Sequence, residues 1–227
     1  MRGFAIHLLR LNYRISSILL AAALLASCAQ RPPAPPRDTV PPLPPRTESP
    51  SEAYLACQAN LSEVGWDFEP IASFTTPDGC GVVEGVKLQR STMMLSRATV
   101  VTCDLAYAIA RFEFEILQPL AEELFKKEVK RIDHVGSYNC RGIRNNRARL
   151  SEHAKGRAID IIGVELTDGT RIRVEADWTD KGPKGQFLRR ATKSACGLFS
   201  VVLGPNADRD HRDHLHLDVG PQRYCGA

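Results

Sequence analysis

Three histidines, His211, His214 and His216, gather near the C-terminal end of the chain. In the segment Asp213-His-Leu-His-Leu-Asp218, strand periodicity would place His214, His216 and Asp218 on one face of a sheet. The two leucines between them would then point into a core. Neighbouring imidazoles can bind a metal ion or transfer protons. The segment therefore predicts a strand that carries a metal or acid–base site.

A second cluster of polar residues occurs in Ser151-Glu-His-Ala-Lys-Gly-Arg-Ala-Ile-Asp160. Gly156 would allow the backbone to turn tightly before a strand. Asp160 then lies between two isoleucines on a strand that we expect to be buried, where a carboxylate is costly without a cation or hydrogen-bond donors. A metal ion is one solution, and a buried hydrogen-bond network is the other.

These two segments carry a resemblance to known families. The first, written Ser151-x-His153-x-x-Gly156-x-Ala158-x-Asp160, resembles a signature of the zinc peptidases that include D-alanyl-D-alanine carboxypeptidases, lysostaphin-like endopeptidases and hedgehog domains. His214-x-His216 resembles their second signature, H-x-H. The span from about Cys80 onward more closely resembles the bacterial extensin-like C-terminal domain family, with Ser-Tyr-x-Cys-Arg ending at Arg141 and a final Asp-His-x-His-Leu-Asp.

The resemblance implies that His153, Asp160 and His216 bind one Zn²⁺, which leaves an open position for water. It implies His214 or Asp213 as the general base. Carboxypeptidase relatives carry Glu in E-x-W-H where this chain has Asp213, and strand parity points Asp213 away from His216.

Two further residues are implied to bind substrate, Arg141 through its guanidinium fork and Ser151, which could instead position His153. A solvated surface role for Arg141 and a plain turn role for Ser151 are the alternatives. We interpret His211 as a loop residue, with an outer partner of a metal ligand as the alternative, and Asp218 as an outer partner that orients an imidazole.

The N-terminal residues 1–27 resemble a lipoprotein signal peptide. Arginines precede a short apolar run, too short to span a bilayer comfortably, and the run ends in Leu25-Ala26-Ser27-Cys28, which resembles a lipobox. Cleavage before Cys28 would make it the lipidated first residue, and Ala29 after it favours sorting to the outer membrane. The alternative is a plain signal peptide cut near Ala29.

Residues 28–50 form a proline-rich segment that we expect to extend as a stiff spacer, and residues 51–227 form the globular domain. With Cys28 assigned to lipid, six cysteines are left, as a disulfide framework in an oxidising compartment requires. The sequence leaves their connectivity open, and nearest-neighbour pairing is our prediction. The pairs would be Cys57–Cys80, Cys103–Cys140 and Cys196–Cys225.

Periodicity predicts an α+β fold, with a small antiparallel sheet that carries the metal site, flanked by helices and stapled by disulfides. Helices are expected over Tyr54–Val64, Asp104–Lys127 and Gln186–Cys196. Strands are expected over Cys80–Val86, Ala158–Val164, Arg171–Val174, Phe199–Leu203 and His214–Val219.

Composition excludes several classes of protein. With 43% hydrophobic and 25% charged residues, the chain is neither disordered throughout nor a polytopic membrane protein. The net charge is +4, but Arg2, Arg10 and Arg14 lie in the predicted signal peptide, so the rest carries only +1. Nucleic-acid binding therefore has no electrostatic support.

Together these features predict an envelope-anchored zinc metallopeptidase, of D,D-carboxypeptidase or endopeptidase type, that acts on stem peptides or cross-links of peptidoglycan on the periplasmic side. The alternative is a non-catalytic, metal-stabilised lipoprotein that binds peptidoglycan or has a structural role. A serine or cysteine hydrolase is disfavoured, because no Gly-x-Ser-x-Gly motif occurs and the cysteines are assigned to disulfides.

The lipobox-like segment gives the first testable prediction. We expect the mature protein to begin at Cys28 and to carry a lipid there, because residues 1–27 have the order of a signal peptide. Intact-mass spectrometry of protein extracted from membranes with detergent measures this directly. An unmodified N-terminus beyond Cys28 would refute the anchor.

Overall fold

The structure is a computed structural model that describes residues 49–90, 93–144 and 146–227. The predicted signal peptide, Cys28 and nearly all of the proline-rich spacer lie outside these residues. Among the helices of the described part, none is long and apolar enough to cross a membrane.

A nine-stranded sheet dominates the described residues, with the strand order β1-β4-β5-β6-β9-β12-β11-β13 and with β10 also paired to β9. Most neighbouring strands are antiparallel, but β5 pairs with β6 and β11 with β13 in parallel. Its strands are β1 (Asp67–Pro70), β4 (Gly85–Arg90), β5 (Met94–Thr102), β6 (Val129–Gly136), β9 (Ala158–Leu166), β10 (Arg171–Arg173), β11 (Val201–Leu203), β12 (Leu215–Asp218) and β13 (Tyr224–Gly226).

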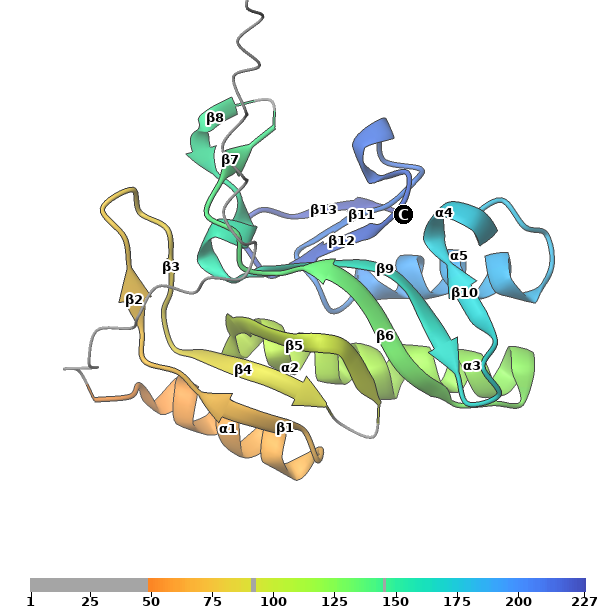
Figure 1. The fold of residues 1–227 in the computed structure, drawn as a ribbon, viewed down its shortest axis with the longest axis horizontal. Coiled ribbons are helices and arrows are strands. Elements are labelled where there is room, and N and C mark those ends of the chain that lie inside the picture. Colours follow the sequence, from red (N-terminus) through yellow and green to blue (C-terminus); the bar gives the residue numbers. More distant parts are fainter. Residues whose placement is uncertain (1–48, 91–92, 145) are drawn as a thin grey trace, which may run out of the picture. The chain divides into compact units, whose positions relative to one another are not determined.

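Two short two-stranded sheets accompany the large one. They pair β2 (Phe74–Thr75) with β3 (Gly81–Val82), and β7 (Gly142–Ile143) with β8 (Asn146–Leu150). Figure 1 shows the β7–β8 hairpin standing out from the large sheet, near the ends of β9 and β12.

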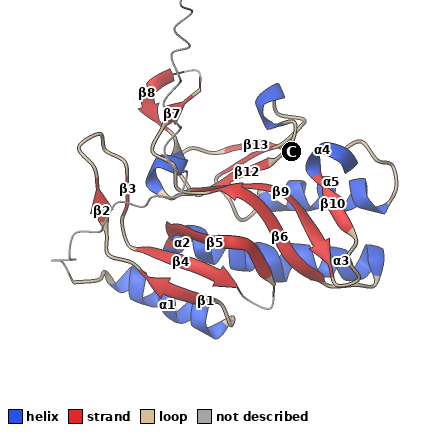
Figure 2. Cartoon of the chain, in the orientation of Figure 1, coloured by secondary structure: helices blue, strands red, loops and turns tan. Residues whose placement is uncertain are grey.

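Helices cover one face of the large sheet. Figure 2 shows the strands in front of the helices in this view, with α2, α3 and α5 behind them. The α-helices are α1 (Glu52–Glu63), α2 (Cys103–Arg111), α3 (Gln118–Phe125), α4 (Val174–Asp177) and α5 (Pro183–Ala195). Apolar side chains of the sheet and of α2, α3 and α5 form one core, among them Ile109, Phe112, Ile159, Phe187 and Leu217.

The predicted helix Asp104–Lys127 is present but is interrupted in its hydrogen bonding. It begins at Cys103 and ends at Phe125, and Phe112–Leu117 between α2 and α3 forms a π-helical segment. Pro119 follows this segment, and a proline has no N–H to continue the α-helical ladder. The apolar residues that recur along this helix, among them Leu105, Ile109, Ile116 and Leu120, pack into the core as predicted.

The prediction of a small antiparallel sheet is wrong, because the sheet is large and partly parallel. The sequence analysis missed its central strands β5 and β6. In β6, charged residues interrupt the apolar pattern. Arg131 forms one ion pair within the strand, with Asp133, and one across the sheet, with Glu165 of β9. The mixed α+β class is confirmed.

Six cysteines form three disulfides, Cys57–Cys103, Cys80–Cys140 and Cys196–Cys225. The framework and the third pair are confirmed, whereas the predicted pairs Cys57–Cys80 and Cys103–Cys140 are wrong. The reason is the fold: α1 packs against α2, which brings Cys57 to Cys103. Nearest-neighbour pairing ignores such contacts.

The Cys80–Cys140 bridge closes a loop with a sequence separation of 60 residues, and Cys140 lies two residues before β7. Replacing both cysteines by alanine should lower the free energy of unfolding by about 2–4 kcal/mol, because the unfolded chain gains freedom. Urea denaturation of the variant and of the parent protein measures the difference. An unchanged midpoint would contradict a stabilising role.

Candidate metal centre

The floor of the candidate site is built by pairing β9 with β12. In this antiparallel register His216 lies opposite Asp160, and directly opposite residues of adjacent strands are close neighbours. The residues on either side of this pair, two isoleucines of β9 and two leucines of β12, are buried in the core beneath the sheet. The polar pair therefore faces the side of the sheet that the helices do not cover.

His153 reaches the same point from a 3₁₀ turn (Glu152–Lys155) that precedes β9. The Ser151 hydroxyl caps this turn by accepting a hydrogen bond from the His153 backbone N–H. Gly156 ends the turn with φ +65°, and a Cβ there would lie 2.7 Å from Cγ2 of Val82. The predicted tight turn at Gly156 is confirmed, and both its conformation and its surroundings require glycine.

Hydrogen bonds to neighbouring groups orient both imidazoles. Nδ1–H of His153 donates to the backbone carbonyl of Ser137 at 2.6 Å, and this oxygen can only accept. Nε2 of His216 lies 3.2 Å from a carboxylate oxygen of the buried Asp218. A neutral imidazole that donates through one nitrogen presents a lone pair on the other. Nε2 of His153 and Nδ1 of His216 are then both electron-pair donors.

These two nitrogens and Oδ1 of Asp160 form a nearly equilateral triangle. Each of the three distances between them is 3.1 Å. Ligands bound to one zinc ion at about 2.0–2.1 Å in a tetrahedron stand roughly 3.3 Å apart. The donor set therefore fits a divalent ion, and His153, Asp160 and His216 could each supply one ligand atom.

The charges of the site also favour a cation. Burial alone would lower the pKa of His216, but hydrogen bonds and charges of Asp160 and Asp218 outweigh this effect and raise the pKa to about 9. Burial would raise the pKa of Asp160, but hydrogen bonds from His153 and His216 hold it far below its usual range. In the absence of a metal ion, a proton on His216 is the compensating positive charge.

His214 stands beside this triangle without belonging to it. Its Nε2 is 3.7 Å from Oδ1 of Asp160, and its Nδ1–H donates to Oδ1 of Asp213 at 2.8 Å. This bond from His214 holds the pKa of Asp213 below its usual value. Asp213 thus orients the His214 ring.

His211 is a member of the site that the sequence analysis assigned to a loop. Its ring centroid lies 5.1 Å from that of His214 and 5.8 Å from that of His216. Its Nδ1 lies 2.8 Å from a carboxylate oxygen of Asp208, as in the His214–Asp213 pair. Burial lowers the pKa of His211 against the opposing effect of Asp208. The sequence held a signal for this role, because Asp208 shortly precedes His211 as Asp213 precedes His214.

A cleft of about 840 Å³ opens above the triangle. Ser151 and the exposed Arg141 both line it, together with Asp160, His211, His214 and His216. The structure thus gathers all the residues that the sequence analysis named as ligand, base or substrate-binding group around one cleft, with Asp213 behind His214.

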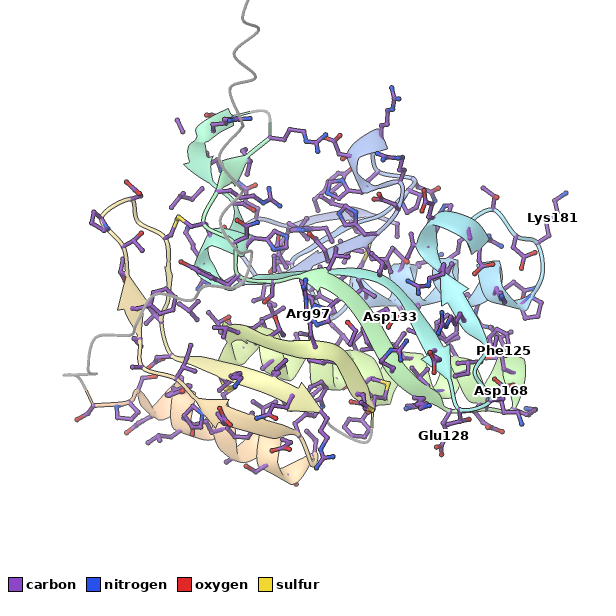
Figure 3. The ribbon with its side chains drawn as sticks, in the orientation of Figure 1. Arg97, Phe125, Glu128, Asp133, Asp168 and Lys181 are labelled. Carbon is purple, nitrogen blue, oxygen red and sulfur yellow. A yellow bond between two sulfur atoms is a disulfide. The ribbon has the colours of Figure 1, made fainter. Side chains whose placement is uncertain are left out.

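We expect the protein to bind one divalent ion, and alanine at His153, Asp160 or His216 to abolish this binding. Asp218→Asn should weaken the affinity about 10–100-fold, since partners of metal ligands commonly have effects of that size. Competition with a chromogenic chelator gives the affinity. Asp168→Asn, at a β-turn far along β9 (Figure 3), is the control and should bind like the parent. Stoichiometric metal in all three alanine variants would defeat the assignment.

Comparisons with known proteins complete the description of the site. No curated protein and no solved structure matches the chain significantly. The family described as extensin-like protein C-terminus matches residues 55–226. This match spans the metal-fitting triangle, the cleft and all three disulfides. The chain therefore belongs to the extensin-like protein C-terminus family.

Proposed function

We propose that the protein is a zinc-dependent peptide hydrolase that acts on stem peptides or cross-links of peptidoglycan. The observation that carries this proposal is the convergence of three electron-pair donors, from His153, Asp160 and His216, at the floor of an open cleft. Three protein ligands and an accessible fourth side are the arrangement of a catalytic rather than a structural zinc site.

When bound, the ion would act as a Lewis acid that polarises a peptide carbonyl and lowers the pKa of water. The protein groups have separate tasks. His214, oriented by Asp213, presents Nε2 toward the floor and can take a proton there. The proton that His214 takes can then return from its Nε2 to the leaving amine. His211, oriented by Asp208, presents a second imidazole to the cleft.

The choice of zinc and of peptide substrates rests on the resemblance to zinc peptidases. This resemblance covers the segment from Ser151 to Asp160 and the pair His214 and His216. In this structure residues of both segments lie together. Asp213 departs from the glutamate of the carboxypeptidases. Its contact with His214 supports different roles, in which His214 is the base and Asp213 positions it.

The choice of peptidoglycan rests on the sequence features outside the domain. A signal peptide with a lipobox and a stiff spacer would hold the domain at the periplasmic side of the cell envelope, with the outer membrane as the expected anchor. Three disulfides suit an oxidising compartment. Because the six cysteines of the described residues are in disulfides, none of them is available as a thiol nucleophile.

One observation favours a second candidate, a metal-stabilised protein that binds peptidoglycan without cutting it. The carboxylate of Asp213 is bonded to His214 rather than directed at the donor triangle. If a carboxylate base is indispensable for hydrolysis, the site binds its ligand and does not react.

A kinetic comparison separates these candidates. His214→Ala should retain the metal ion and lose about 10²–10⁴-fold in hydrolysis, the usual contribution of a positioned base. Asp213→Asn should have a smaller effect, because the ring of His214 remains in place. The measurement is release of D-alanine or cleaved stems from purified peptidoglycan with zinc supplied, and Asp168→Asn is again the control.

Two results would argue against the proposal. If Asp213→Asn abolishes hydrolysis while His214→Ala retains most of it, then Asp213 is the base. If the metal-loaded parent protein binds peptidoglycan but releases nothing above a chelated sample, the peptidase assignment is wrong and the binding role stands.

A further inference from the structure

The β7–β8 hairpin forms one wall of the cleft and is rich in arginine. Four arginines of this segment line the cleft: Arg141, Arg144, Arg147 and Arg149. The hairpin buries little, since β8 is exposed along nearly its whole length. A role in the core therefore does not explain the four positive charges.

These arginines differ in their partners. Arg144 reaches across the cleft and forms an ion pair with Asp210 at 2.5 Å. Within the part of the chain that the structure describes, Arg141, Arg147 and Arg149 form no ion pair with a carboxylate. An anionic ligand on this wall would pair with these three guanidinium groups.

Arg147 and Arg149 lie on the same side of the hairpin. They belong to the irregular part of β8, where its pairing with β7 shifts register between Asn146 and Leu150. Both line the cleft, whereas Ala148 between them does not. An extended peptide in the cleft could therefore present acidic side chains to both guanidiniums. Guanidinium binds carboxylate through two parallel hydrogen bonds.

We propose that Arg147 and Arg149 bind two carboxylates of an extended acidic peptide, and so align this peptide along the wall of the cleft. The proposal rests on the proposed function, because it names the chemical class of substrate for that same site. It adds a recognition element outside the metal-fitting triangle and independent of Arg141.

The surroundings favour carboxylates over a polyphosphate. The opposite wall and the floor contain Asp160, Asp208 and Asp218, which would repel a ligand with dense negative charge. A peptide with separated carboxylates can keep both against β8 while its neutral backbone crosses the floor.

Binding of short probe peptides to the metal-free protein tests this proposal without hydrolysis. The probes are acetyl-Ala-Glu-Ala-Glu-Ala-amide, the same peptide with Gln in place of Glu, and inorganic polyphosphate. The full-length chain is kept in a chelator, and affinities are measured by fluorescence anisotropy of labelled probes at low salt, where exposed charges are least screened.

We expect the Glu peptide to bind at least about tenfold more tightly than the Gln peptide, as one good charged contact provides. The double variant Arg147→Gln/Arg149→Gln should lose this preference. Its matched control is Lys181→Gln/Lys193→Gln, which removes the same charge. Lys181 lies on the loop before α5, far from the hairpin (Figure 3), and Lys193 is exposed on α5, so this control should keep the preference.

Three outcomes would overturn the proposal: equal affinity for the two peptides, a preference that survives in the double variant, or a preference that the lysine control loses as well. Polyphosphate binding as tightly as the Glu peptide, through the same arginines, would also overturn it in favour of a general site for oxyanions. Failure of the proposed function looks different, because the peptide preference would persist in a protein that hydrolyses nothing when loaded with zinc.

Discussion

The register between β9 and β12 is the constraint on which the candidate site depends. It sets His216 opposite Asp160 and, in the same pairing, the leucines of β12 opposite the isoleucines of β9. A slip of one residue would turn both sets to the wrong faces. Burying four such side chains contributes roughly 6–12 kcal/mol. The core thus holds the donors together even though they have no favourable interaction of their own without a cation or a proton.

The neighbouring strand completes this arrangement. β6 pairs with β9 so that Gly136 lies opposite Asp160, and the next residue, Ser137, supplies the carbonyl that orients His153. Three adjacent strands therefore deliver their contributions at one level of the sheet. The turn that carries His153 is fixed separately, by the Ser151 cap and by the contact of Gly156 with Val82. Each donor side chain is thus oriented before an ion binds, as a site requires if it is to bind without rearranging its side chains.

Local patterns could predict the parts of this fold that follow one period. The alternation in the predicted strand His214–Val219 placed His214 and His216 on one face, and the apolar residues recurring from Leu105 to Leu124 identified the long helix. What failed depends on contacts between distant segments. β6 was missed because its charges are compensated across the sheet by Glu165, and the Cys57–Cys103 pair because packing of α1 against α2 sets it. Which distant residues contact each other cannot be derived from any single segment of the sequence.

The floor of the cleft and its hairpin wall carry charges of opposite sign. The floor holds the carboxylates of Asp160 and Asp218 among imidazoles and would be stabilised by a cation. The hairpin wall presents Arg141, Arg147 and Arg149, which form no ion pair among the described residues, and would be stabilised by an anion. An anionic ligand on the wall is attracted by the arginines and repelled by the floor. A cation at the floor removes part of that repulsion, so each ligand favours the other, and linkage requires the two effects to be equal in free energy. The separation of charge also gives a direction to any ligand that spans the cleft, because its anionic groups are stable only on the side of the hairpin.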